Sequence, residues 1–434
     1  MAFFPLRSAL CALPYALLFR TPNSAFRIGK MALIVQKYGG TSVADLNRIR
    51  NVAEKVIKVR EAGNDVVVVL SAMAGVTNRL IQMAHEIADD PNSRELDVLL
   101  ATGEQTTVSL FSIMLESMGC PAVSLLGYQA SIITDTAFGR ARISEINADR
   151  IRGLLSQGKV VAVAGFQGRD QQGNITTLGR GGSDTSAVAI AAALGADMCE
   201  IYTDVNGVYT TDPNLCDKAR KLDRISYDEM LEMASLGAKV LQIRSVEFAK
   251  KYRVPLQVRS SFTEEEGTMV VEEEKDMERL VVSAVAYSKD EARITVTNVP
   301  DRPGIASKIF TAVAEAGIVV DMIIQNTRQS GLTDLTFTVP KTDYKKAISI
   351  QKEVAESIGA EEVLGDENIA KVSVIGVGMR SHYGIAAQMF TALAEENINI
   401  MMISTSEIKI SCIIKEEQME SAVKVLHRVF GLDG

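Results

Sequence analysis

Short apolar runs alternate with stretches of helical periodicity from residue 31 to about residue 259. Ala32–Gln36 and Val66–Leu70 are apolar runs of strand length, and between them the apolar positions of Leu46–Val59 recur every three or four residues, as on one face of a helix. In the same way we expect strands at Ala122–Leu125, Val160–Ala164, Cys199–Thr203 and Leu256–Arg259, and helices at 79–89, 104–118, Asp184–Leu194 and twice within 227–251. This alternation predicts an α/β fold with a mainly parallel sheet and helices on both faces.

The C-terminal part contains one pattern twice. Pro303–Ile323 matches Tyr383–Ile403 at a constant offset, so that Phe310 falls on Phe390. Each copy runs turn, helix, strand, strand and follows an alternating strand, at Arg293–Asn298 and Lys371–Ile375. Such a duplication serves either stability alone or a paired ligand-binding module with symmetric pockets where the copies meet.

Composition marks the boundaries between these parts. Glu264–Glu278 is rich in acids and contains a glycine, so we expect a linker there. Residues 1–30 have no Asp or Glu, and their apolar stretch, Ala9–Phe19, is too short to cross a bilayer. We expect translation to begin at Met31, with a targeting segment or a disordered arm as alternatives. The predicted parts are an extension at 1–30, an α/β domain at 31–263, a linker at 264–280, and repeats around 293–365 and 371–434 within 281–434.

Charge and cysteine usage limit the function classes. The chain of 434 residues has a net charge of −8, which argues against nucleic acid or an anionic membrane as the main partner. Its five cysteines are scattered and odd in number, as expected of a cytoplasmic protein without a disulfide framework. Its three histidines form no cluster in the sequence, so we expect neither a zinc site nor a Ser–His triad.

Two glycine-rich loops that carry charges are the main candidates for chemistry. Lys37–Ser42 and Gly179–Thr185 each fall where a strand is expected to end and a helix to begin. Glycine lets backbone N–H groups approach an anion closely, and the start of a helix adds a partial positive charge. Because these loops contain Lys37, Arg180 and Asp184, the sequence predicts a site that binds and transfers phosphate.

Six motifs resemble those of bacterial aspartate kinase, a family within the amino-acid kinase superfamily. They are Lys37–Ser42, Ser71–Met73, Thr102–Glu104, Phe166–Gly168, Gly179–Thr185 and Tyr202–Tyr209. The C-terminal repeat resembles the paired ACT regulatory domains of that family. The resemblance implies a carbamate-kinase-like three-layer α/β/α sandwich followed by two α+β, ferredoxin-like ACT domains. It also implies ATP-dependent phosphorylation of the β-carboxylate of L-aspartate, the first step toward lysine, threonine, methionine and, in bacteria, diaminopimelate.

The catalytic residues suit phosphoryl transfer to a carboxylate, which depends mostly on positioning and charge neutralisation. An aspartate carboxylate is ionised at neutral pH, so no general base is needed. We assign Lys37 to stabilising the transferring phosphate and Arg180 to a planar grip on a substrate carboxylate. Asp184 organises Lys37 and the Mg²⁺ of the nucleotide, caps a helix, or does both.

The resemblance extends to substrate and nucleotide contacts. Glu104 is implied to bind the α-ammonium of the substrate, within the set Ser71, Thr77, Glu104, Arg180, Gly181 and Ser183. The implied nucleotide set is Lys37, Gly39, Gly40, Ser42, Thr203, Asp204, Tyr209 and Lys239, with Mg²⁺ arriving on ATP and no separate protein metal site. Asn214 departs from the family pattern, in which Arg is frequent, and so puts one nucleotide contact in doubt. Asn206 replaces a frequent Asp.

The ACT pair implies regulation by amino acids, with lysine, threonine or both as the effectors. The implied effector contacts are Asp301, Gly304, Ile305, Gln325, Asn399, Ser406 and Glu407. We expect a homo-oligomer formed through the ACT domains and no nucleic-acid or membrane partner. A shorter regulatory subunit could start internally near Met269 or Met277, as in some relatives.

Two other functions compete with a feedback-inhibited aspartate kinase. One is a kinase for glutamate or a nucleoside monophosphate, against which Glu104, Ser71–Met73 and the ACT pair argue. The other is a non-enzymatic amino-acid sensor with an inert kinase domain. The intact Lys37, Arg180 and Asp184 argue against a sensor, whereas Asn214 favours it.

Overall fold

The computed structural model describes residues 32–237, 240–273, 281–327 and 331–433. The chain divides into two compact units, Met1–Glu200 and Ile201–Gly434, and each is described by itself. The expected extension at 1–30 lies outside the described residues, as does Lys239.

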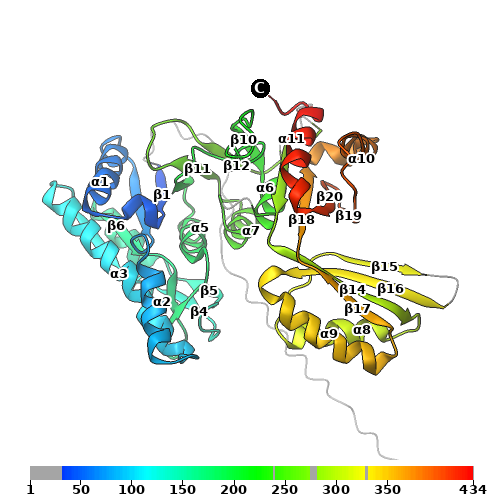
Figure 1. The fold of residues 1–434 in the computed structure, drawn as a ribbon. Coiled ribbons are helices and arrows are strands. Elements are labelled where there is room, and N and C mark those ends of the chain that lie inside the picture. The colour runs from blue at the N-terminus through cyan, green and yellow to red at the C-terminus, as the bar shows by residue number, and fades with distance from the viewer. Residues whose placement is uncertain (1–31, 238–239, 274–280, 328–330, 434) are drawn as a thin grey trace, which may run out of the picture. The chain divides into compact units, whose positions relative to one another are not determined.

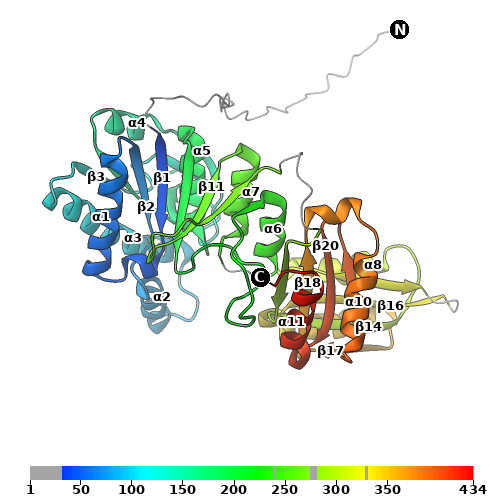
Figure 2. The ribbon, with the colours of Figure 1, turned by 90° about the horizontal axis from the view of Figure 1, so that it is seen from above.

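A parallel sheet forms the centre of the first unit (Figures 1 and 2). Strands β1 (Leu33–Tyr38), β2 (Asp65–Leu70), β6 (Val160–Ala164) and β3 (Ala122–Leu125) lie in this order and pair in parallel. Strand β9 (Met198–Thr203) lies beside β1. The run Val66–Leu70 is buried throughout, as expected of a parallel strand covered on both faces. The predicted α/β class is confirmed.

Helices cover both faces of this sheet. In both ribbon views α1 (Leu46–Glu61) and α3 (Ser93–Ser117) lie on one side and α5 (Gly182–Leu194) on the other (Figures 1 and 2). Helix α5 packs on β1 and β2, whereas α3 packs on β3 and β6. The remaining helices are α2 (Val76–Ile87), α4 (Asp149–Ser156) and the short 3-10 helix η1 (Gly40–Val43).

Helix α3 is longer than the sequence predicts. The expected segment 104–118 is only its second half, because the glycine at 103 does not interrupt it. A Cβ at Gly103 would lie 2.8 Å from the Cβ of Ala72, so a close contact requires glycine there. Helix α3 is also long and apolar enough to cross a membrane, but half of its most apolar window is buried inside the protein. Core packing therefore accounts for its apolar character.

The first unit also contains a small sheet of short strands that the sequence pattern does not predict. It runs in the order β5 (Ile143–Ile146), β4 (Ile132–Thr134), β7 (Gln167–Arg169) and β8 (Ile175–Thr177). Strands of three or four residues are too short to display a two-residue alternation. This sheet matters for the site because β8 leads directly into the loop Gly179–Thr185.

The second unit begins with three strands and two helices. Strands β10 (Arg224–Ser226), β12 (Thr268–Val271) and β11 (Leu256–Ser260) lie in this order, accompanied by α6 (Tyr227–Ser235) and α7 (Ile243–Tyr252). Strand β12 falls inside the expected linker 264–280, so that prediction is wrong for Thr268–Val271. Thr268 and Val270 are buried, and β12 pairs antiparallel with β11. The acidic residues around this strand hide its short alternation.

The two C-terminal repeats form two four-stranded sheets with helices, which confirms the ferredoxin-like α+β prediction. The first has the strand order β15-β16-β14-β17, and the second has the order β13-β18-β20-β19. The first copy consists of β14 (Glu291–Pro300), α8 (Ile305–Glu315), β15 (Ile323–Thr327), β16 (Leu332–Pro340), η2 (Lys341–Asp343), α9 (Tyr344–Ile358) and β17 (Glu362–Asp366). The second consists of β18 (Ile369–Ile375), η3 (Val377–Ser381), α10 (Ile385–Glu395), β19 (Met402–Thr405), β20 (Lys409–Lys415), η4 (Glu416–Gln418) and α11 (Met419–Val429).

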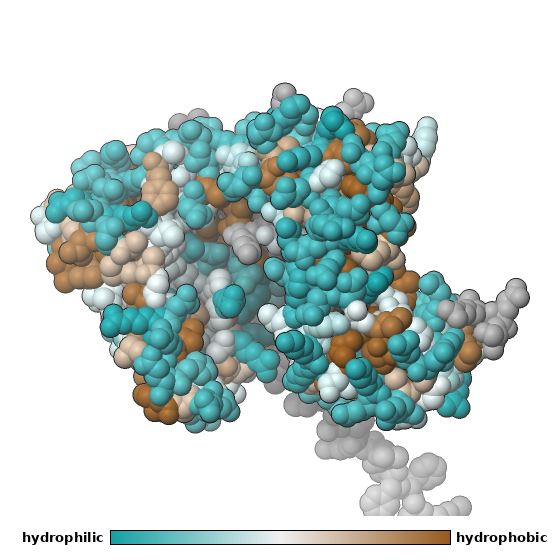
Figure 3. Space-filling view, in the orientation of Figure 1, coloured by the Kyte–Doolittle hydropathy of each residue, from teal (hydrophilic) through white to brown (hydrophobic). Residues whose placement is uncertain are grey.

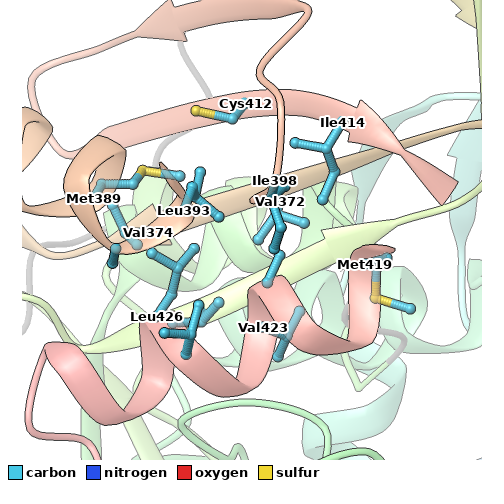
Figure 4. Close-up of a cluster of buried hydrophobic side chains, with 14 of the residues drawn as sticks. Val372, Val374, Met389, Leu393, Ile398, Cys412, Ile414, Met419, Val423 and Leu426 are labelled. Carbon is cyan, nitrogen blue, oxygen red and sulfur yellow. The ribbon is translucent and has the colours of Figure 1, made fainter. Parts of the chain in front are cut away.

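The second repeat takes its edge strand from before the first. Strand β13 (Ala284–Ser288) pairs antiparallel with β18, although the whole first repeat separates them in sequence. Side chains of β18, β20, α10 and α11 fill the core between this sheet and its helices (Figure 4). The face seen in Figure 3 is mainly hydrophilic. Among the residues of the repeats, Val319, Ile323 and Ile403 are exposed.

Candidate active site

A buried ion pair joins the two glycine-rich loops in the first unit. Lys37 lies near the end of β1 and Asp184 in the first turn of α5. The Lys37 Nζ lies 2.5 Å from Asp184 Oδ1, and about a tenth of each side chain is exposed, 12% and 11%. The packing of α5 on β1 thus brings together two charges that are 147 positions apart in the sequence (184 minus 37).

Glycines let the backbone approach closely at both loops. Gly39 caps η1, and the Ser42 N–H donates to the Gly39 carbonyl at 2.9 Å. A Cβ at Gly40 would lie 2.7 Å from the Ala72 carbonyl oxygen. Gly181 caps α5 with a φ of 66°, in the left-handed region that favours glycine.

The loop between β8 and α5 presents groups of different accessibility. Arg180 is exposed, as is Gly181, whereas Ser183 is buried beside Asp184 in the first turn of α5. The α5 N-terminus contributes a partial positive charge, while three of its first four backbone N–H groups donate to carbonyls of the preceding loop. This combination is suited to binding an anion such as a carboxylate or a phosphate.

Glu104 lies in the middle of α3, so the prediction that it heads a helix is wrong. Its Oε1 accepts a hydrogen bond from the Ala72 N–H at 3.0 Å, while Oε2 is buried and has no hydrogen-bond partner among the described residues. Burial raises the pKa of Glu104 to about 7, although the Ala72 N–H lowers it in part. A buried carboxylate oxygen without a partner is suited to a cationic ligand group.

The two predicted substrate hydroxyls, of Ser71 and Thr77, belong to the part of the chain that follows β2. Ser71 directly follows β2 and precedes Ala72, the hydrogen-bond donor to Glu104. Thr77 is the second residue of α2. Both side chains are partly exposed.

The sequence-based prediction misses Asp97, because it places the start of this helix at residue 104. Asp97 is buried on α3 and accepts from the Gly139 N–H with both oxygens at 3.0 Å. It also accepts from Thr177 N at 2.8 Å and Thr177 Oγ1 at 2.6 Å. Asp97 thereby fixes the end of β8, two residues before Gly179. No spacing in the sequence marks Asp97, because its hydrogen-bond partners come from segments far away in the chain.

The predicted nucleotide residues of the second unit line one pocket of about 450 Å³. Its lining includes Thr203, Asp204, Tyr209 and Asn214. The Thr203 hydroxyl donates to Asp204 Oδ1 at 3.1 Å. Asn206 lies outside this lining and bonds with Glu265 and Thr263. Lys239 belongs to the residues that the structure does not describe.

Asn214 has a defined partner at the rim of this pocket. Its backbone N–H and its Nδ2 both donate to Asp212 Oδ1, at 2.9 and 3.1 Å. Asp212 Oδ2 accepts from the Tyr287 hydroxyl at 2.9 Å. The amide at position 214 is therefore held against the carboxylate of Asp212.

The predicted effector residues are distributed over both C-terminal repeats. Gly304 caps α8 with a φ of 91°, as Gly384 caps α10 with a φ of 88°. Ile305 is buried at the start of α8, and Gln325 is exposed on β15. Three others are exposed in the second repeat, namely Asn399, Ser406 and Glu407. Asp301 lies in the turn after β14.

Comparisons with known proteins agree with this architecture. Residues 32–260 match the amino acid kinase family, and residues 293–356 and 372–430 each match an ACT domain. An aspartokinase of Pseudomonas aeruginosa is 58% identical over 405 residues, covering 93% of this chain and 98% of the relative.

Solved structures of similar proteins include aspartokinase III of E. coli in two states. The structure in complex with aspartate and ADP (R-state) has a TM-score of 0.77 and 27% identity, covering 92% of this chain and 99% of that one. The structure with lysine and aspartate (T-state) has a TM-score of 0.74 at the same identity and coverage. With the matched kinase and ACT ranges and the 58% identity, these findings identify the chain as a member of the aspartokinases within the amino acid kinase family.

Proposed function

We propose that this chain is an ATP:L-aspartate 4-phosphotransferase, which transfers the γ-phosphate of ATP to the β-carboxylate of L-aspartate. The products are 4-phospho-L-aspartate and ADP. The observation that carries the proposal is the pairing of a buried Lys37–Asp184 ion pair with the unpartnered Oε2 of Glu104 in one unit. The ion pair holds a cation for phosphoryl transfer, and the unpartnered carboxylate oxygen can accept a hydrogen bond from the ammonium group of an amino acid.

Glu104 is proposed to receive the α-ammonium of aspartate. The ammonium would supply the missing hydrogen-bond donor to Oε2 and would favour the ionised carboxylate. Arg180 is proposed to hold a carboxylate of the substrate with its planar guanidinium. Ser71, Thr77, Gly181 and Ser183 complete the proposed substrate contacts with hydroxyl and backbone donors.

Lys37 is proposed to stabilise the charge that develops on the transferring phosphate oxygens. The ion pair with Asp184 holds its ammonium in one position before substrate binds, so little reorganisation is needed during the reaction. The acceptor carboxylate is already ionised, and the site therefore requires no general base. Gly39, Gly40 and Ser42 are proposed to approach the phosphates with backbone N–H groups.

The pocket lined by Thr203, Asp204 and Tyr209 is proposed to bind the nucleotide, and Lys239 remains a predicted contact. We propose that Mg²⁺ arrives on the phosphates of ATP, where it neutralises their charge.

The ACT domains are proposed to bind lysine, threonine or both, and to reduce activity when occupied. The E. coli relative was solved with lysine in its T-state, which supports lysine as one effector. An effector inhibits only if it binds a low-activity arrangement more tightly than the active one. We further propose a cytoplasmic homo-oligomer joined through the ACT domains.

A direct test measures aspartate-dependent ADP release by the full chain and by two lysine variants. Lys37→Ala should lower kcat by about a hundredfold or more, because it removes a charge that stabilises the transition state. Lys58→Ala, at an exposed lysine on α1, is the matched control and should retain the full rate. Full activity of a folded Lys37→Ala variant would refute the proposed mechanism, and no turnover by the folded unmodified chain would favour the sensor.

A further inference from the structure

The segment Thr210–Cys216, which contains the rim of the proposed nucleotide pocket, contacts the second ACT domain. The Val285 N–H of β13 donates to the Thr210 carbonyl at 2.8 Å, and the side chain of Thr210 bonds with His427 Nε2 of α11 at 2.8 Å. The segment Thr210–Cys216 also contributes Leu215 to the hydrophobic core of that domain. These contacts attach the rim to the regulatory sheet and to its helix.

Tyr287 contacts both the core of the second ACT domain and the rim of the pocket. Its ring packs against the core of the second ACT domain, and its hydroxyl donates to Asp212 Oδ2 at 2.9 Å. The other oxygen of Asp212 accepts both hydrogen bonds from Asn214. One carboxylate thus connects a side chain of β13 to the residue at which this chain departs from the expected arginine.

Tyr287 also forms part of the pocket wall. Residues 285–290 line the pocket together with Thr203, Asp204 and Tyr209. Burial, together with the neighbouring Asp212 carboxylate, raises the pKa of Tyr287 to about 12. The phenol therefore keeps its proton, and with it the hydrogen bond, throughout the neutral pH range.

We propose that Tyr287 is a positioning residue for nucleotide binding, which acts by holding Asp212 and Asn214 at the rim of the pocket. Tyr287 lies outside all three ranges that match family models, so this role belongs to neither the kinase nor the ACT model. The inference rests on the proposed function, because it takes this pocket as the nucleotide pocket.

The test removes only the hydroxyl of Tyr287. Tyr287→Phe keeps the ring in the ACT core, and loss of a hydrogen bond to a carboxylate should raise the Kd for ADP and the KM for ATP roughly threefold to tenfold. The KM for aspartate and kcat should stay within about twofold, because no group that contacts aspartate changes. Calorimetric titration with Mg-ADP gives the Kd without an acceptor substrate.

Tyr227→Phe is the matched control. The Tyr227 hydroxyl donates to the Val254 carbonyl at 2.7 Å, so the same group and one hydrogen bond are lost away from this pocket. The control should leave the Kd for ADP unchanged. In a double-mutant cycle, Tyr287→Phe combined with Asp212→Ala should bind ADP no more weakly than Asp212→Ala alone, because the Tyr287 hydroxyl acts through Asp212.

Three results would overturn the proposal. They are an unchanged Kd in Tyr287→Phe, an equal rise in Tyr227→Phe, or a parallel rise of both KM values in Tyr287→Phe. Because the titration needs no aspartate, an unmodified chain that binds ADP but does not phosphorylate aspartate would refute the proposed substrate and leave the role of Tyr287 tested.

Discussion

At the scale of single residues, Glu104 carries the most specific information about the substrate. It is an acid on a buried helix face with one oxygen satisfied and the other left without a partner. Its desolvation holds the pKa near neutrality instead of near 4.5. A lysine or arginine of the protein could have paired with this oxygen, but none among the described residues does. The site is therefore poised for a cation that comes with the ligand.

This pKa predicts a pH dependence of aspartate binding. Above about pH 7 Glu104 is ionised and attracts the α-ammonium, whereas below about pH 7 it is protonated and the attraction is lost. Hence kcat/KM for aspartate should fall about tenfold for each pH unit below 7. Glu104→Gln should have a low kcat/KM with no such ionisation. A pH profile that is identical in the two proteins would contradict the role of Glu104.

At the scale of elements, the long periodic segments were predictable and the short strands were not. Strand β6 and the helix start at Leu46 agree with the sequence pattern, because they show a full apolar run and several helical turns. The four short strands of the small sheet carry too few residues for a period. The extra length of α3 was hidden by Gly103, whose reason is a contact with Ala72.

The candidate site also has features that the sequence predicts and features that it does not. The glycine loops and the charges of Lys37, Arg180 and Asp184 could be read from the sequence, because each loop combines glycines with charged residues just before an expected helix. The ion-pair distance, the unpartnered oxygen of Glu104 and the role of Asp97 depend on tertiary packing. No spacing in the sequence encodes them.

The hairpin of β7 and β8 offers a prediction at this scale. Asp97 fixes the end of β8 that leads to Arg180, and Asp170 fixes the turn at the opposite end with hydrogen bonds from Gln172 and Asn174. Asp97→Asn should raise the KM for aspartate about tenfold, because an unsatisfied Thr177 donor displaces the Arg180 loop.

Asp170→Asn is the control for the hairpin. Both variants should lower the Tm, since both disturb a buried carboxylate that accepts several hydrogen bonds. Only Asp97→Asn should change the KM, as measured by initial rates at varied aspartate. An equal KM increase in both variants would show that Asp97 acts only through general stability.

At the scale of the whole molecule, strand β13 ties the regulatory part together. It lies before the first repeat in sequence but completes the sheet of the second, so the second copy is not a consecutive module, whereas the sheet of the first copy is built from β14 to β17 alone. A polypeptide that starts at Met269 or Met277 still contains β13 and every other strand of both regulatory sheets. This organisation supports the proposal that a shorter regulatory subunit could fold from an internal start.

Trapping the acyl phosphate product tests most directly whether the enzyme phosphorylates the β-carboxylate of aspartate. The chain is incubated with Mg-ATP, L-aspartate and hydroxylamine, which converts an acyl phosphate into a stable hydroxamate. β-Aspartyl hydroxamate should form together with ADP, and no hydroxamate should form when L-glutamate replaces aspartate. Folded protein that yields no hydroxamate from aspartate, or that yields more from glutamate, would contradict the proposed reaction.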